Sequence, residues 1–298
     1  MLIPVCSESS GASPEVRDVV LEGADGVPLS ALLAEPRRSP PRAVVVALHG
    51  GGMRAGYFHG RAHPSLSLLT LGAELGFTVL AVDRPGYGLS AERMPEGGTL
   101  EEQAGCLHGA LERFAADRAV GAGFFLVAHS SGGKVALCMA ASDEHRGLVG
   151  LDLSGCGHRH AVDVRSFLES SGRDVWRLHW GASRFYPEST FSAARSLLTP
   201  MPPVEIEEAA RWPRFFPGIA GRVHSPVRFT FSEHELWWRH DEESVGELTA
   251  LLGSSRVRVD RQEGAGHNIS LGWAARSYHL RALAFAEDCV RASGAGRR

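Results

Sequence analysis

The sequence predicts an α/β protein with a doubly wound, mostly parallel sheet, an N-terminal antiparallel hairpin and an inserted helical cap. Three observations lead to this fold class. Aliphatic runs that suit strands buried on both faces alternate with segments of helical periodicity, which is the pattern of βαβ units. An early Asp-Gly pair between two apolar runs predicts the hairpin. One long segment, rich in aromatic residues and proline, lacks any strand pattern and predicts the cap.

Composition places the chain among ordinary globular proteins. Of its 298 residues, 44% are hydrophobic and 22% are charged, and a net charge of -3 argues against a nucleic-acid partner. No apolar run approaches the roughly 20 residues of a membrane span. The N-terminus lacks a basic, apolar leader, and the odd number of scattered cysteines favours free thiols, so we expect a cytoplasmic protein. The cysteines are Cys6, Cys106, Cys138, Cys156 and Cys289.

The first half of the chain supplies the hairpin, two buried strands and a helix. Two strand-like runs flank the turn at 24–26, and Ala43 to Leu48 is a continuous aliphatic run that stops at a glycine cluster. A second such run, 77–82, ends at an aspartate and a Gly/Pro loop. A helix follows, where Thr99 and Glu102 have the spacing of a capping box.

The second half repeats the alternation around the proposed cap. The run GFFLVAHS predicts a buried strand, SGGKVALCMAA a short apolar helix, and GLVGLDLSG a further strand. After the cap, PVRFTFSEHE and RVRVDRQEGAGH predict two more strands, and the chain closes with a helix. We expect the core to comprise residues 14–157 and 224–293, the cap or lid residues 158–223, and residues 1–13 and 294–298 to be flexible.

A nucleophile is predicted within the stretch VAHSSGGK. A nucleophile on a sharp strand-to-helix turn needs small residues two positions before and after it. Ser130 meets this condition, with Ala128 before it and Gly132 after it, whereas Ser131 follows the bulky His129 by two positions. The alternative is a turn of small residues without any catalytic role.

A serine needs a base, and the base needs a carboxylate that holds it. His267 follows the last predicted strand in a glycine-rich loop, and Glu235 lies at the end of the strand before it. Glu233 and, less well placed, Asp152 are the alternatives for the acid. The order serine, acid, histidine is the one that this kind of fold uses.

The anionic intermediate of acyl transfer needs two preformed N–H donors. We expect one from Ser131, directly after the nucleophile, and the other from Gly51, or next Gly52, in the loop HGGG. Glycines there allow the backbone to approach a substrate oxygen closely.

These segments resemble the α/β-hydrolase superfamily, in its capped, serine esterase-like branch. LHGGG is similar to the oxyanion loop, DRPGYGLS to the loop after the fourth strand, AHSSGG to the nucleophile elbow, SEHE to the acid loop and GAGH to the histidine loop. The resemblance spans about Val19 to Val290 and departs from the family pattern at Ala128, usually glycine, and at Glu235, usually aspartate. Serine as nucleophile implies acyl chemistry rather than cleavage of epoxides or carbon–halogen bonds.

The predicted function is therefore hydrolysis of an ester, a thioester or a related acyl bond in a medium-sized apolar compound, without a cofactor. Two alternatives stay open: the same triad in lyase, acyl-transfer or cyclisation chemistry, and a non-catalytic ligand-binding member of the superfamily. His158 and His160 lack a third ligand at metal-binding spacing, and Cys156 is poorly placed as a nucleophile. We expect the substrate pocket to include Met53, His129, Trp176, Trp180, Trp237 and Trp238. The oligomeric state is not predicted.

Overall fold

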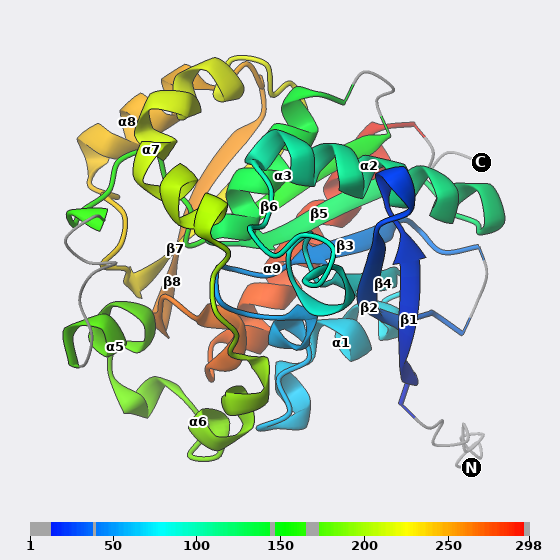
Figure 1. Ribbon diagram of the computed structural model, residues 1–298, viewed down its shortest axis with the longest axis horizontal. Helices are drawn as coiled ribbons and strands as arrows, with labels where there is room; N and C mark the ends of the chain where they lie inside the picture. Colours follow the sequence, from blue (N-terminus) through cyan, green and yellow to red (C-terminus); the bar gives the residue numbers. More distant parts are fainter. Residues whose placement is uncertain (1–12, 38–39, 144–146, 165–172, 295–298) are drawn as a thin grey trace, which may run out of the picture.

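The computed structural model describes residues 13–37, 40–143, 147–164 and 173–294, and Figure 1 shows its central sheet with helices on both sides. The strands are β1 (Val16–Glu22), β2 (Pro28–Ala34), β3 (Val44–Leu48), β4 (Thr78–Val82), β5 (Phe124–His129), β6 (Leu148–Ser154), β7 (Val227–His234) and β8 (Val257–Gly266). The helices are α1 (Leu68–Glu74), α2 (Leu100–Asp117), α3 (Ser131–Ala141), α5 (Arg173–Trp180), α6 (Thr190–Ala193), α7 (Pro203–Ala220), α8 (Glu242–Leu251) and α9 (Ala275–Ala292).

The eight strands form one sheet in the order β1-β2-β4-β3-β5-β6-β7-β8, which confirms the predicted fold class. β2 runs antiparallel to both of its neighbours, and the pairs from β4 through β8 are parallel. The turn that joins β1 to β2 is a short 3-10 segment at Ala24–Gly26, where Asp25 adopts a positive φ of 53°. The carboxyl ends of β3, β5, β6, β7 and β8 therefore meet at one edge of the sheet, where ligands bind in open α/β folds.

Two hydrophobic layers cover the two faces of the sheet. One layer joins inward side chains of α2, α3, α7 and α8 to the sheet, and the other joins those of α1 and α9. The predicted capping box of α2 is present: the Glu102 N–H donates to the Thr99 hydroxyl, and the Thr99 N–H donates to the Glu102 carboxylate. The helices thus follow the sequence pattern on both faces, as a doubly wound sheet requires.

The segment between β6 and β7 contains α5, α6 and α7 and lies on the side of the molecule opposite β1 (Figure 1). The prolines of this segment do not all end helices, because α7 continues through Pro213 and Pro217. Proline removes one helical hydrogen bond, but Trp212 and Phe216 of α7 are fully buried against the core, and this burial offsets the loss. Among the helices of the described ranges, none is long and apolar enough to cross a membrane.

Candidate active site

Ser130 sits on a sharp turn between β5 and α3. Its backbone, with φ 52° and ψ −119°, lies in a region that costs about 1–3 kcal/mol for a residue with a side chain. The turn is tight because a Cβ on Gly132 would lie 2.3 Å from the carbonyl oxygen of Leu48 and 2.5 Å from that of His49. The predicted need for a small residue two positions after Ser130 therefore has a direct structural cause.

The histidine and the carboxylate predicted from the last two loops meet at this turn. His267 Nε2 lies 3.1 Å from Ser130 Oγ, and His267 Nδ1 lies 2.8 Å and 3.0 Å from the two carboxylate oxygens of Glu235. Because a carboxylate only accepts, Nδ1 carries the proton and Nε2 presents its lone pair to the serine hydroxyl. A further donor, the backbone N–H of Trp237, holds Glu235 Oε1 at 2.9 Å.

The competing candidates occupy other positions. Glu233 accepts the N–H of Gly264 at 2.8 Å on the surface, and Asp152 is fully buried in an ion pair with Arg228. Burial raises the pKa of the Cys156 thiol to about 12, so the thiolate needed for nucleophilic attack is scarce at neutral pH. None of these groups replaces Glu235 or Ser130 in the arrangement.

The glycine loop after β3 lies beside the turn. Gly51, Ser130 and Ser131 line one cavity, and Ser131 is the first residue of α3, where the N–H groups at a helix start are not used by the helix itself. Gly52 has a φ of 67°, and its N–H donates to the Tyr87 hydroxyl at 3.1 Å. This bond engages the Gly52 amide, so of the two glycines proposed as donors the geometry favours Gly51.

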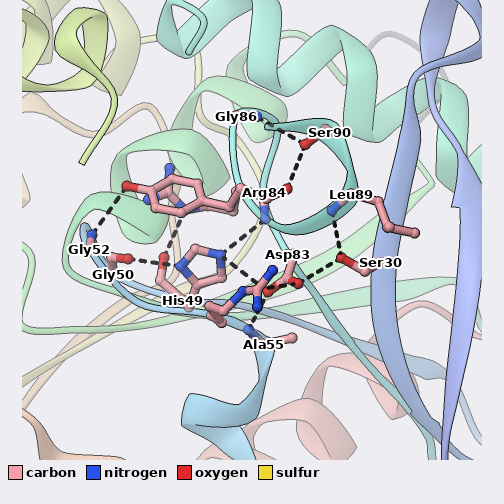
Figure 2. Close-up of polar contacts among 12 residues, drawn as sticks. Ser30, His49, Gly50, Gly52, Ala55, Asp83, Arg84, Gly86, Leu89 and Ser90 are labelled. Carbon is pink, nitrogen blue, oxygen red and sulfur yellow. Dashed lines mark hydrogen bonds and ion pairs between the residues drawn. The ribbon is translucent and has the colours of Figure 1, made fainter. Parts of the chain in front are cut away.

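A buried network behind the glycine loop holds its shape (Figure 2). His49 Nδ1–H donates to the Gly50 carbonyl at 2.8 Å, and His49 Nε2 accepts the N–H of Arg84 at 3.0 Å. Burial and the positive charge of Arg84 lower the pKa of His49, so the ring stays neutral in this tautomer. Asp83 accepts the N–H of Ala55 at 2.6 Å, which ties the end of the loop to the segment after β4.

Arg84 also connects the glycine loop to the inserted segment. Its guanidinium donates to the His49 carbonyl at 2.8 Å and to Glu205 of α7 at 2.8 Å. Glu205 accepts in addition from the Tyr87 hydroxyl at 3.0 Å, the same hydroxyl that receives the Gly52 N–H. Since Arg84 and Glu205 are both buried, the inserted helix and the loop are joined by an ion pair shielded from water.

A cavity of about 170 Å³ opens beside Ser130 and His267. Four residues predicted for the pocket line it: Met53, His129, Trp237 and Trp238. The prediction is wrong for the two tryptophans of α5, which do not line it. Trp180 packs on Tyr186 and Phe191, and Trp176 is 40% exposed and packs on Phe191. Both tryptophans turn toward Phe191 of α6, and Trp180 belongs to the hydrophobic layer that also contains α1 and α9.

Several lining residues were not predicted from the sequence. They come mainly from the inserted segment and from α3: Lys134, His160, Val164, Val175, His179, Met201, Ala209 and Asn268. The inserted segment has no strand periodicity that would place its residues, so the sequence did not indicate which of them face the cavity. Lys134 did carry a signal, because the 31 basic residues of the chain include a single lysine, and it interrupts an apolar helix.

His129 and His179, whose rings lie next to that of His267, are neutral neighbours rather than alternative bases. Burial lowers the pKa of His129, whose ring stacks on Tyr57 at 4.7 Å between centroids. Burial and the proximity of His267 lower the pKa of His179 to about 4. His158 contacts Glu247 at 3.1 Å, and within the described ranges no group of His, Cys, Asp or Glu has a geometry that could hold a metal ion.

A family profile described as "Alpha/beta hydrolase family" matches residues 45–287. The match covers most of the chain, so the protein belongs to the alpha/beta hydrolase family. Comparison with curated proteins gives no match.

Similar solved structures include three enzymes of this architecture. An enol-lactonase from Burkholderia xenovorans LB400 has a TM-score of 0.69 at 15% identity, covering 90% of this chain and 100% of its own. A soluble variant of monoglyceride lipase from Saccharomyces cerevisiae has a TM-score of 0.67 at 13% identity, and the match covers 96% of this chain and 99% of the lipase. A thermostable carboxyl esterase from Bacillus coagulans has a TM-score of 0.66 at 17% identity, and the match covers 92% of this chain and 99% of the esterase. At these identities the similarity establishes the fold.

Proposed function

We propose that this protein is a serine hydrolase that cleaves an ester, a thioester or a related acyl bond of a small molecule through an acyl-enzyme. The observation that carries the proposal is the chain of contacts from Glu235 through His267 to Ser130, with distances of 2.8 Å and 3.1 Å. In this series of contacts the carboxylate accepts from Nδ1–H and Nε2 can accept from the serine hydroxyl, which is the arrangement that general-base activation of a serine requires. Membership of the alpha/beta hydrolase family supports hydrolysis as the reaction class.

In the proposed first step, His267 Nε2 takes the proton of Ser130 Oγ as that oxygen attacks the substrate carbonyl carbon. Glu235 accepts from Nδ1–H throughout and stabilises the imidazolium that forms. The oxyanion is received by the N–H groups of Gly51 and Ser131 at the start of α3. The positive end of the α3 dipole adds a stabilising field at this point.

In the second step, the imidazolium of His267 returns its proton to the leaving group, whose bond to the carbonyl carbon breaks. A water molecule then occupies the place of the leaving group, gives a proton to Nε2, and attacks the acyl-enzyme. Collapse of the second tetrahedral intermediate releases the acid and restores the Ser130 hydroxyl. No metal or organic cofactor enters these steps.

The cavity supports a smaller acyl group than the sequence suggested. At about 170 Å³ it lies below the roughly 300–1,000 Å³ of pockets for drug-sized ligands. Trp237, Trp238 and Met53 give it an apolar wall, which suits a short carbon chain. We propose that residues 158–223 act as a cap that encloses the carbon chain of the substrate, since α5 and α7 contribute Val175 and Ala209 to the cavity lining.

Hydrolysis of p-nitrophenyl esters from acetate to decanoate tests the proposal. We expect turnover with an optimum at short chains and a steep decline beyond them. Ser130→Ala is expected to lower kcat by about 10³-fold or more, because the nucleophile acts as a unit with its base. Absence of turnover in folded protein across the series, or undiminished turnover in the variant, would contradict the proposed function.

A further inference from the structure

Lys134 is the single lysine among the 31 basic residues of the chain, and it lines the candidate active-site cavity. It lies on α3, four residues after Ser130, which corresponds to just over one helical turn, or ~6 Å along the axis. Its side chain is 4% exposed. An ammonium this deeply buried is rare unless it is paired, because removing a charge from water is costly.

Two aromatic faces lie next to this ammonium. Lys134 Nζ lies 5.5 Å from the ring centroid of Trp238 and 5.8 Å from that of Trp212. Within the described ranges, no carboxylate comes within ion-pair distance of it. The nearest acidic groups are engaged elsewhere: Glu205 binds Arg84 and Tyr87, and Glu208 accepts the N–H of Leu100 at 2.6 Å.

Other groups around Lys134 add no negative charge. His160 lines the same cavity and donates Nε2–H to the Ala209 carbonyl at 3.1 Å, and burial lowers its pKa to about 4, so its ring is neutral. Cys156 is a protonated thiol. Desolvation lowers the pKa of Lys134 to about 8, so at pH 7 the side chain is still mostly a cation. The cavity thus contains one positive charge that feels Glu205 and Glu208 at a distance but has, in the described part of the chain, no carboxylate at ion-pair distance.

We propose that Lys134 binds an anionic group, a carboxylate, carried by the substrate, and that the protein therefore selects small acyl esters with a second, ionised acid function. The inference rests on the proposed hydrolase function and names its substrate class. A carboxylate in the cavity supplies the missing counter-ion and accepts charge-assisted hydrogen bonds from the ammonium. A short carbon chain between ester and carboxylate suits a nucleophile and an ammonium that belong to one helix start and lie four residues apart, ~6 Å along the helix axis.

The first test compares matched esters by kcat/KM, with product acids measured by mass spectrometry. Monoethyl glutarate carries the carboxylate on the acyl side, the butanoyl ester of glycolate carries it on the leaving-group side, and ethyl pentanoate and ethyl butanoate are the neutral partners. We expect wild type to prefer one anionic ester over its neutral partner by about tenfold or more. The side on which the preference appears identifies the position of the carboxylate.

Three variants assign the preference to the ammonium. Lys134→Met is expected to lower the anionic-to-neutral ratio of kcat/KM by about 10- to 100-fold. Lys134→Arg, which keeps the charge, restores part of the ratio. Arg214→Met removes the same charge from an exposed position of α7 and serves as the control. A wild type without preference, or Lys134→Met with an unchanged ratio, overturns the proposal.

A binding measurement decides the question independently of turnover. Because the chain has one lysine, incorporation of ¹³Cε-lysine gives a single side-chain NMR signal without further assignment. In Ser130→Ala protein, we expect this signal to shift saturably with monoethyl glutarate or with the glycolate ester, and not with ethyl pentanoate. No shift with either anion at millimolar concentration overturns the proposal. Failure of the hydrolase function itself has a different signature, namely no turnover of any ester by wild type.

Discussion

Replacing Glu235 by glutamine changes one oxygen to an NH₂ group in a place where the structure predetermines its orientation. The backbone N–H of Trp237 donates to Oε1 at 2.9 Å, and His267 Nδ1 lies 2.8 Å from Oε2. In Glu235→Gln the amide oxygen keeps the Trp237 N–H, so the NH₂ group faces Nδ1. Nδ1 then faces the NH₂ group at its shorter contact of 2.8 Å and keeps an oxygen acceptor only at 3.0 Å, so the exchange favours the tautomer with the proton on Nε2, directly against the Ser130 hydroxyl.

The magnitude follows from this exchange of tautomers. With the proton on Nε2, His267 cannot act as the base for Ser130, and the carboxylate that stabilises the imidazolium is gone. The corresponding change in the triad of serine proteases lowers kcat by roughly 10⁴-fold, or about 5 kcal/mol of transition-state stabilisation. We expect a loss of about 10³- to 10⁴-fold here, with little change in folding, because shape and volume are conserved.

The assay is kcat and KM for a short p-nitrophenyl ester, with the melting temperature as the check on folding. Glu233→Gln is the matched control, since it removes the same charge two residues away, where Glu233 accepts the Gly264 N–H at the surface and lies 3.9 Å from His234 Nε2. We expect the control to stay within about threefold of wild type. If Glu235→Gln retains a third or more of kcat, or if the control loses as much, the role proposed for Glu235 is refuted.

Three further changes have defined outcomes. Folding lowers the pKa of Lys134 to about 8, so the free energy of unfolding of the wild type rises between pH 8 and the unfolded pKa near 10.4. In urea unfolding, Lys134→Met should therefore be more stable than wild type at pH 7 by about 3 kcal/mol, and this difference should shrink by pH 10. Glu205→Gln removes the buried partner of Arg84 and should lower the free energy of unfolding by about 3–5 kcal/mol. The control Glu207→Gln, at an exposed position of the same helix, should change it by less than about 0.5 kcal/mol. Gly132→Ala clashes with backbone oxygens and should abolish ester turnover, whereas Gly105→Ala, with open space around it, should raise the melting temperature.

The sheet could be predicted from the sequence because its signals are local. The aliphatic run that begins at Ala43 became β3 within one residue, and Thr99 with Glu102 marked the start of α2. Ser130, Glu235 and His267 were predicted by the same logic, since each follows a strand end and the carboxyl ends of parallel strands converge. Chain order and strand period therefore suffice to bring the three side chains together.

The inserted segment could not be predicted in the same way. Trp176 and Trp180 were expected in the pocket because they are aromatic, yet which face of α5 turns inward depends on its packing against α6, which the sequence does not encode locally. The continuation of α7 through Pro213 depends likewise on burial of Trp212 in the core. Long-range packing, rather than propensity, determines which of these residues reach the cavity.

The central claim is that Ser130 is the activated nucleophile, and intact mass after treatment with a fluorophosphonate probe tests it most directly. We predict a single adduct on wild type that is absent from Ser130→Ala and retained by Ser131→Ala, whose side chain is not required. A folded wild type that takes up no adduct, or an adduct that persists in Ser130→Ala, would contradict the account.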